Sequence, residues 1–473
     1  MKYVSTRGEA PTLAFDDVLL TGLARDGGLY VPESWPHFST GEIASFASLS
    51  YKDLAFQVVQ PFIGGVIADA DLKSIIDAAY SHFDTDEVAP LTELSDGEWI
   101  MELFHGPTLA FKDIAMQFLG PLFDHVLAAR DEHICIVAAT SGDTGSAAIE
   151  ACRDRNNIDI FILYPHGRVS DVQRRQMATV VAPNVHTIAL QGTFDDCQDT
   201  VKALFNDLAF RDRMNLSAVN SINWVRIVAQ IVYYFWAALR VSAPAGPVSF
   251  AVPTGNFGNV FAGYAAHRMG LPVEQFIVGT NANDILVRFF ESGIMEIEAV
   301  VPTISPSMDI QISSNFERLL FELYDRDSSM VARTLKAFRL DGQFAVDADI
   351  LARTRKIFDG GRYTDNQTRA LIANHYAKTG ELLDPHTAVG LAVSRSHRRN
   401  SSTPMVALAT AHPAKFPEAV EAASGVYPGL PAHMADLFDR DELINVIPND
   451  LAAVRGFIED RAKNADRIGG AAP

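Results

Sequence analysis

From about residue 130 onward, short apolar runs rich in β-branched residues alternate with stretches of helical spacing. The clearest of these apolar runs are residues 133–140, 158–165, 184–190, 248–254, 275–281 and 405–410. Such alternation is typical of βαβ units, in which parallel strands are covered by helices on both faces. The sequence therefore predicts an α/β fold with open, mostly parallel sheets and helices on both faces of each sheet.

The length of the chain, 473 residues, is too great for one hydrophobic core. At about 150 residues per domain we expect two or three domains. Residues 1–95 lack the alternation and show helical stretches near 40–60 and 70–83, which indicates a separate helical N-terminal module. We expect residues 96–420 to form a core of two α/β units, and residues 421–473 to form a helical C-terminal cap.

Composition limits the partners of the chain. Hydrophobic residues make up 48%, which excludes a disordered chain, and 58 acidic against 39 basic residues give a net charge of −19. Such a surface repels nucleic acid and acidic lipid, and the sequence contains no compensating basic run. We therefore expect neither nucleic acid nor membrane as a partner, whereas a pocket for a small anion needs only local positive charge.

The location of the protein is predicted from three further features. The N-terminus carries no apolar stretch long enough for a signal peptide, and the longest nearly apolar segment, residues 227–241, suits a buried helix better than a membrane span. The three cysteines, Cys135, Cys152 and Cys197, are odd in number and lack CxxC spacing, which is typical of thiols in a reducing compartment. We expect a soluble cytoplasmic protein.

The first candidate site is the turn Thr254–Asn259, which follows one predicted strand and precedes a helix. Ligands of α/β sheets bind beyond the carboxyl ends of strands. The two glycines of this turn let backbone N–H groups converge, and the helix dipole favours an anion, so the turn can cradle a phosphate. The patterns GxxxxGK[ST] and GxGxxG are both absent. A tight turn that needs its glycines only for geometry is the alternative.

The second candidate is the turn Thr140–Gly145, again between a strand and a helix. Its hydroxyl groups suit a carboxylate or phosphate ligand. The alternative is plain capping, with Asp143 or Thr144 bonded to the first N–H groups of the helix.

The third candidate is Lys112, which lies between the apolar triplets 109–111 and 114–116. Desolvation disfavours an ammonium group, and the free amine that results can form a Schiff base. The alternatives are a lysine that extends past its apolar neighbours to solvent, or one paired with Asp113.

The fourth feature is a polar stripe on an otherwise apolar helix, formed by Asn223, Arg226 and Gln230. A buried guanidinium needs an anionic partner, either a structural carboxylate or a substrate phosphate, which arginine binds through two hydrogen bonds. The histidines show no HExxH and no regular metal spacing, so we expect no metal site.

Together these features resemble the threonine synthase family, pyridoxal-phosphate enzymes of fold type II related to the tryptophan synthase β chain. The resemblance covers nearly the whole chain and looks like the long bacterial and fungal form. It is carried by YVSTRG (3–8), GLARDGGLYVP (22–32), HGPTLAFKD (105–113), ATSGDTGSAA (139–148), VNSINWVRI (219–227), VPTGNFGN (252–259), SMDI (307–310), SSNFERLLF (313–321) and TAHPAKF (410–416).

The resemblance implies roles for individual residues. Lys112 would carry pyridoxal 5'-phosphate as a Schiff base, and Thr410 would meet the pyridine nitrogen. Asp143 stands where the wider group has Asn beside the phenolic oxygen of the cofactor, so either a cofactor contact or helix capping is open. The residues implied to hold the cofactor phosphate are Gly255, Asn256, Phe257, Gly258 and Asn259. The residues implied to surround the substrate are Thr140, Ser141, Thr144, Asn220, Ser221 and Arg226.

The reaction implied by the resemblance converts O-phospho-L-homoserine and water to L-threonine and phosphate, by γ-elimination and addition of water at Cβ. We expect a monomer or homodimer. A related lyase that releases 2-oxobutyrate instead of threonine would share all four features. A dehydratase of the same fold has no use for Arg226 or the N-terminal module, and a non-enzymatic metabolite-binding protein is the remaining alternative.

Overall fold

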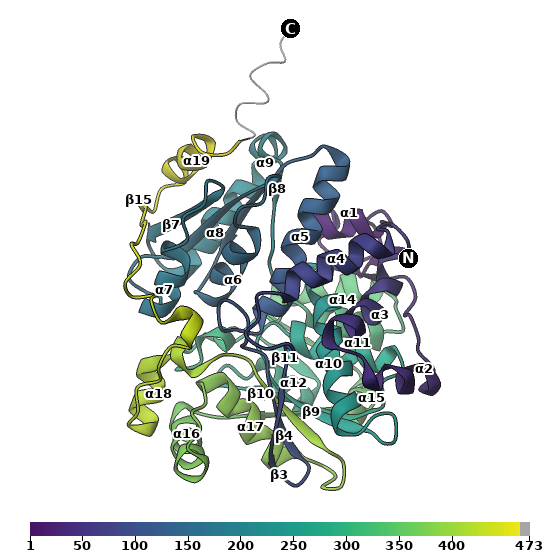
Figure 1. Cartoon of the computed structure of the whole chain (residues 1–473). Helices are drawn as coiled ribbons and strands as arrows, with labels where there is room; N and C mark the ends of the chain where they lie inside the picture. The colour runs from purple at the N-terminus through teal and green to yellow at the C-terminus, as the bar shows by residue number, and fades with distance from the viewer. Residues whose placement is uncertain (464–473) are drawn as a thin grey trace.

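Two parallel sheets form the framework of the computed structural model, which describes residues 1–463. The larger sheet has six strands in the order β13-β10-β9-β14-β4-β3 and lies in the lower part of Figure 1. Its strands are β13 (Phe358–Arg362), β10 (Val273–Thr280), β9 (Val248–Pro253), β14 (Met405–Ala409), β4 (Glu98–Glu102) and β3 (Leu91–Ser95). All neighbours in this sheet are parallel except β3 and β4, which pair antiparallel.

The second sheet has five strands, all parallel, in the order β15-β7-β6-β5-β8, and lies in the upper part of Figure 1. Its strands are β15 (Val446–Pro448), β7 (Val185–Gln191), β6 (Ile158–Pro165), β5 (Ile134–Ala139) and β8 (Leu216–Ser217). Two short antiparallel pairs stand apart: β1 (Tyr3–Ser5) with β2 (Tyr30–Pro32), and β11 (Ile294–Glu296) with β12 (Gln343–Ala345).

Alternate residues of each central strand enter different hydrophobic clusters. In β9, Phe250 and Val252 join the main core, whereas Ala251 packs into a second cluster with Leu391. Successive side chains of a strand point to opposite faces, so a strand buried on both faces is apolar throughout. This explains why the predicted strands are continuous apolar runs, and it confirms helices on both faces of parallel sheets.

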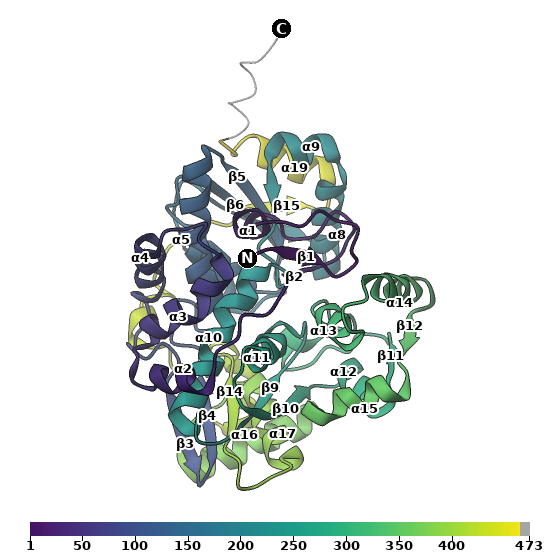
Figure 2. The same cartoon turned by 90° about the vertical axis from the view of Figure 1, so that its right-hand side faces the viewer.

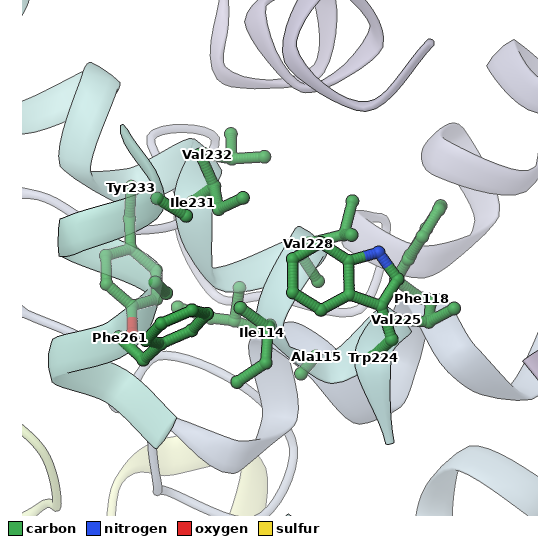
Figure 3. Packing of buried hydrophobic residues seen from close by; sticks show 14 of the residues in the cluster. Ile114, Ala115, Phe118, Trp224, Val225, Val228, Ile231, Val232, Tyr233 and Phe261 are labelled. Atoms are coloured by element: carbon green, nitrogen blue, oxygen red, sulfur yellow. The ribbon is translucent and has the colours of Figure 1, made fainter. Parts of the chain in front are cut away.

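The centre of the molecule is α10 (Trp224–Val241), whose residues from Trp224 to Leu239 are all buried. It packs against α5 (Lys112–Arg130) and α11 (Gly258–Arg268), and Figure 3 shows side chains of the three helices in contact. The apolar segment 227–241 is therefore a buried helix, as predicted. Among residues 1–463 we find no helix with the length and apolar character needed to span a membrane.

The N-terminal residues form four helices beside α5 and α10, coloured purple in Figure 1. These helices are α1 (Phe15–Leu20), α2 (Thr40–Ser45), α3 (Tyr51–Ile63) and α4 (Asp69–Tyr80). Capping residues begin two of them: the side chain of Ser39 caps α2 and that of Ser50 caps α3. The helical stretches expected in this part of the chain are therefore present.

The remaining helices cover the two sheets. Around the five-stranded sheet lie α6 (Asp143–Cys152), α7 (Asp171–Ala178), α8 (Phe194–Asn206), α9 (Leu208–Met214) and α19 (Leu451–Glu459). The rest are α12 (Ile285–Ser292), α13 (Phe316–Leu323), α14 (Ser328–Asp341), α15 (Ala348–Ile357), α16 (Asp365–Thr379), α17 (Pro385–His397) and α18 (Pro417–Ser424). Figure 2 shows α12 to α15 gathered on one side of the six-stranded sheet together with β11 and β12.

The C-terminal segment differs from the expected helical cap, because it also supplies a strand. β15 pairs parallel with β7, at residues Ala189 to Gln191, and so extends the five-stranded sheet. Three residues are too few to give a recognisable period, and the sequence therefore showed only α19. The last residues of the chain, 464–473, lie outside the described part.

Candidate active site

The carboxyl end of β14 is joined to the start of α5 by backbone hydrogen bonds. Phe111 N donates to Thr410 O at 2.9 Å, and His412 N donates to Leu109 O at 3.0 Å. These bonds fix the segment before Lys112 against the residue that follows β14. Residues that are about 300 positions apart in the sequence, Lys112 and Thr410, are thereby brought to the same edge of the sheet.

Lys112 is the first residue of α5, and its side chain is only 11% exposed. Its Nζ donates a hydrogen bond to Oδ2 of Asp143 at 2.9 Å. The carboxylate of Asp113 is not its partner, because it accepts hydrogen bonds from the backbone and the hydroxyl of Thr108 instead. Neither alternative for this lysine holds: it does not reach open solvent, and it is paired with a residue from another helix.

Asp143 lies at the start of α6 but does not cap it, since no side-chain cap bond is present there. The Oγ1 of Thr140 accepts instead from the backbone N–H groups of Gly142 and Gly145, at 3.0 and 2.9 Å. Gly142 has φ +135°, and a Cβ at this position would lie 2.3 Å from Gln173. The capping alternative for Asp143 is therefore wrong, and its carboxylate faces the interior.

The carboxylate of Asp143 is held by four side chains. Besides Lys112, Gln173 Nε2 donates to Oδ1 at 2.9 Å, Ser307 Oγ donates to Oδ2 at 3.2 Å, and Lys415 Nζ lies 3.3 Å from Oδ1. Burial alone would raise the pKa of Asp143, but the two ammonium groups and the amide outweigh burial and hold the pKa well below its usual range. Asp143 is therefore an ionised carboxylate inside the protein.

The turn after β9 has the geometry of an anion site. Phe257 adopts the left-handed conformation, with φ 61°, immediately before α11 begins at Gly258. Gly255 approaches the neighbouring segment so closely that a Cβ would lie 2.9 Å from Ser307 O. The side-chain oxygen of Asn259 accepts from Tyr233 and Tyr234, at 2.6 and 2.8 Å. These bonds fix its amide, whose buried Nδ2 has no partner among the described residues.

An unpaired buried donor at a helix N-terminus is costly unless a ligand accepts its hydrogen bond. The phosphate of a cofactor would satisfy Asn259 Nδ2, and the adjacent glycines leave room for it. Since Lys112 also supplies an amine at the same sheet edge, the residues present fit pyridoxal phosphate.

Arg226 is buried on α10, with 4% of its surface exposed. Its Nη1 donates to Val219 O at 2.9 Å, and its buried Nε has no partner in the described part of the chain. Burial lowers the pKa of this guanidinium to about 10. Within residues 1–463 no carboxylate forms an ion pair with it, so the structural-carboxylate alternative is wrong and the charge of Arg226 has no compensating partner in the described part of the chain.

The other predicted residues differ in their exposure. Thr410 is buried and donates its backbone N–H to Thr387 Oγ1 at 3.2 Å. Ser141 and Asn220 are exposed, while Thr144 and Ser221 are half-buried. The structure brings Lys112, Asp143 and the backbone of Thr410 together through hydrogen bonds, and it shows no such bond between Arg226 and the polar groups after β5.

The sequence interpretation assigned no role to Gln173, Ser307 or Lys415, which hold Asp143. Lys415 carried a visible signal, because it lies in the segment AHPAKF between apolar residues, as Lys112 does. Ser307 begins the motif SMDI (307–310), which carried the resemblance but no role, and Gln173 gave no signal because it is an ordinary polar residue in a polar stretch.

Three family models match the chain in order. "Threonine synthase N terminus" matches residues 2–80, "Pyridoxal-phosphate dependent enzyme" residues 87–337, and "Threonine synthase, C-terminal" residues 387–458. The chain is 58% identical to a threonine synthase of Pseudomonas aeruginosa, over 97% of this chain and 98% of the relative.

Solved structures agree with these matches. A pyridoxal-phosphate-bound threonine synthase from Brucella melitensis is 54% identical with a TM-score of 0.96, and the alignment covers 98% of this chain and all of that one. The threonine synthase from yeast is 40% identical with a TM-score of 0.92, and 99% of each chain is covered. The resemblance drawn from the sequence motifs is thus confirmed, together with the cofactor pyridoxal phosphate. The chain belongs to the threonine synthase family of pyridoxal-phosphate-dependent lyases, enzymes of amino-acid biosynthesis.

Proposed function

We propose that this chain converts O-phospho-L-homoserine and water to L-threonine and phosphate, with Lys112 as the reacting side chain. The observation that carries the proposal is the Nζ of Lys112, which is held 2.9 Å from the buried carboxylate of Asp143 at the edge where β14 ends. An amine in this position can both carry a cofactor and transfer protons.

The cofactor would be held by residues from four parts of the fold. Lys112 is the point of covalent attachment, and the turn Gly255, Asn256, Phe257, Gly258, Asn259 would bind the phosphate at the N-terminus of α11. Thr410 would meet the pyridine nitrogen with a neutral hydroxyl, and Asp143 would lie beside the phenolic oxygen. When bound, pyridoxal phosphate supplies a conjugated ring that delocalises the electron pair left at the substrate Cα.

The free amine of Lys112 would act as base and acid toward the substrate. It would take a proton from Cα of O-phospho-L-homoserine and would move a proton at Cβ, which would allow the γ-phosphate to leave. The ionised carboxylate of Asp143 orients this amine through their hydrogen bond.

The departing phosphate would be bound by Arg226, whose buried guanidinium has an unused Nε–H. A positive group placed where negative charge grows stabilises that charge most when water is excluded. The hydroxyl and amide groups of Thr140, Ser141, Thr144, Asn220 and Ser221 would complete the substrate site. Because Ser141 and Asn220 are exposed, we expect their segments to close over the bound substrate before water is added at Cβ.

The test is to mix the purified protein with O-phospho-L-homoserine and to follow phosphate and the amino-acid products together. Threonine and phosphate released one for one would support the proposal. Release of phosphate with 2-oxobutyrate and ammonia would reassign the chain to the related lyase reaction. If no phosphate were released, the substrate would be wrong even though the family is established.

We also infer how the chain is organised and where it works. The division into an N-terminal module (1–95), a catalytic core (96–420) and a C-terminal cap (421–473) is supported by the helices α1 to α4 beside α5, whereas β3 and β15 extend the two sheets of the core with residues from the first and last segments. The acidic net charge of −19 supports an enzyme that acts on a small molecule without nucleic acid, and we infer further that it is a cytoplasmic monomer or homodimer. Light scattering at working concentration would give the oligomeric state.

A further inference from the structure

A second lysine lies inside the protein beside the candidate site. Lys415 is the last residue of the 3-10 turn η3 (Pro413–Lys415), and its side chain is 0% exposed. Its Nζ donates to Thr108 O at 2.6 Å and to Gln176 Oε1 at 2.7 Å, and lies 3.3 Å from Asp143 Oδ1. The ammonium group thus has three partners, Thr108 O, Gln176 Oε1 and Asp143 Oδ1, and of these only Asp143 is charged.

A fully buried lysine is rare and costly, and nothing in the proposed reaction uses this one. Burial lowers the pKa of Lys415, and the carboxylates of Asp143 and Asp113 act in the opposite direction. A neutral side chain such as methionine at position 415 would fill the same space without this cost. The positive charge of Lys415 therefore needs an explanation.

Asp143 stands between two lysines from different parts of the chain. Its Oδ2 accepts from Lys112 Nζ at 2.9 Å, while its Oδ1 faces Lys415 Nζ at 3.3 Å. Two ammonium groups therefore share one ionised carboxylate. If Lys112 gives up its proton, Asp143 and Lys415 remain as a balanced pair. Without Lys415, the same loss would leave a buried, uncompensated carboxylate, and the protonated form of Lys112 would be favoured.

We propose that Lys415 is a positioning residue that acts through Asp143 and makes the neutral amine of Lys112 accessible for proton transfer. This inference rests on the proposed role of Lys112 as the base. The amine concerned is the free one, which Lys112 has when it does not carry the cofactor, and the proton that this amine loses goes to solvent.

The groups that face this cluster can be named from each surrounding element. They are Asp143 from α6, Asp113 from α5 and Lys415 from η3, with the neutral Gln173 from α7 and Ser307 from the connecting segment. His386 of α17 is one step removed, because its Nε2 accepts from Ser307 N at 3.2 Å. Burial raises the pKa of Asp113 to about 6, so this carboxylate is mostly ionised at neutral pH, and its hydrogen bonds come from Thr108 and not from either lysine.

The experiment compares the pH dependence of kcat for the holoenzyme and for Lys415→Met. Removing a positive charge near Lys112 favours the protonated form of Lys112. The acidic limb of the kcat profile should therefore move to higher pH, by about one pH unit or more. Below that limb the rate should fall about tenfold for each unit. The pH midpoint of the visible absorbance of the bound cofactor should move in the same direction, which gives a readout independent of turnover.

Two control variants separate charge from structure. Lys415→Arg keeps the charge and should return the limb toward its original pH. Gln176→Leu removes a neutral contact of Lys415 but no charge, and should leave the limb in place even if it destabilises the protein. A limb that is unmoved in Lys415→Met, or that moves equally in Gln176→Leu, would overturn the inference.

Failure of the role proposed for Lys415 can be distinguished from failure of the proposed function. If the unaltered protein releases no threonine from O-phospho-L-homoserine, the proposed function fails, and the absorbance midpoints of the variants still test the role of Lys415. If Lys415→Met does not fold, Lys415→Gln, which keeps a donor for Thr108 O, is measured in its place against the same two criteria.

Discussion

At the scale of single residues, the site depends on ionised side chains that are buried and therefore contact one another. Lys112 begins α5 beside the end of β14 in the six-stranded sheet, and Asp143 begins α6 after β5 in the five-stranded sheet, so their hydrogen bond links the two sheet units. In Lys112→Ala we expect turnover and the absorbance of the bound cofactor to be lost. The fold should survive, since Asp143 keeps Gln173, Ser307 and Lys415.

Activity, the visible spectrum and circular dichroism of Lys112→Ala check this prediction, with the exposed Lys202→Ala as control. A yellow and fully active Lys112→Ala protein would show that another lysine carries the cofactor.

Replacement of Arg226 should lower activity without lowering stability. In Arg226→Met, kcat/KM for O-phospho-L-homoserine should fall on the order of a hundredfold, because a donor for the leaving phosphate is lost. The melting temperature should stay the same or rise, because an unpaired buried charge is replaced by an apolar side chain. Arg240→Met, at the exposed end of the same helix, is the control. Unchanged kcat/KM in Arg226→Met would remove it from the phosphate site.

His105 makes stability depend on pH. Its Nδ1 lies 2.7 Å from Asp84 Oδ1 and its Nε2 lies 2.8 Å from Glu102 Oε2. Burial would lower the pKa of His105, but the two carboxylates outweigh burial and raise it. A histidine whose pKa is raised by folding stabilises the protein below about pH 6.5, and this contribution is lost as the pH rises through the folded pKa.

We therefore expect His105→Gln to destabilise the protein at pH 6 by on the order of 1 kcal/mol more than at pH 9, a size limited by the partly exposed Asp84. Urea unfolding at both pH values measures the difference, with the exposed His82→Gln as control. An equal loss of stability at both pH values would mean that His105 acts only through packing.

At the scale of elements, the turn between β9 and α11 is defined by contact with a distant segment. A Cβ on Gly255 would lie 2.9 Å from the backbone oxygen of Ser307, which cannot move as freely as a side chain. Gly255→Ala should therefore weaken cofactor binding, and overpacking should destabilise the fold by about 1–3 kcal/mol.

Equilibrium dialysis of the cofactor and thermal unfolding test Gly255→Ala. Gly429→Ala is the matched control, because a Cβ there has no neighbour within 4 Å. If Gly255→Ala retained the cofactor as well as the control does, the close approach would be unimportant for the phosphate turn.

At the scale of the whole molecule, the free cysteines report on global unfolding. Cys135, Cys152 and Cys197 are all buried, and burial raises the pKa of Cys152 and of Cys197 to about 12 and holds that of Cys135 well above its usual value. A thiol reagent attacks the thiolate, so modification of the native protein should be slow and should follow the unfolding rate. Labelling with and without guanidinium chloride measures this, and rapid labelling of the native protein would contradict the burial of these thiols.

Much of the fold could be predicted because most strands and helices follow from the pattern of neighbouring residues. Strands β5, β6, β7 and β9 fall within one or two residues of their predicted ranges, because each is a continuous apolar run buried on both faces. Short strands could not be predicted: β8 has two residues and β15 three, and pairing across the chain defines them.

The family and the cofactor could be predicted from the sequence, and Lys112 could be proposed as the attachment residue, since motifs and local periodicity do not depend on distant contacts. The partners of Asp143 are known from the folded chain alone, because Lys112, Gln173 and Ser307 are 31, 30 and 164 residues away from it. The same holds for Lys415, which lies beside Asp143 only in the folded chain. The physical reason is burial: each ionised group must find a partner in the interior, and packing of distant segments decides which partner that is.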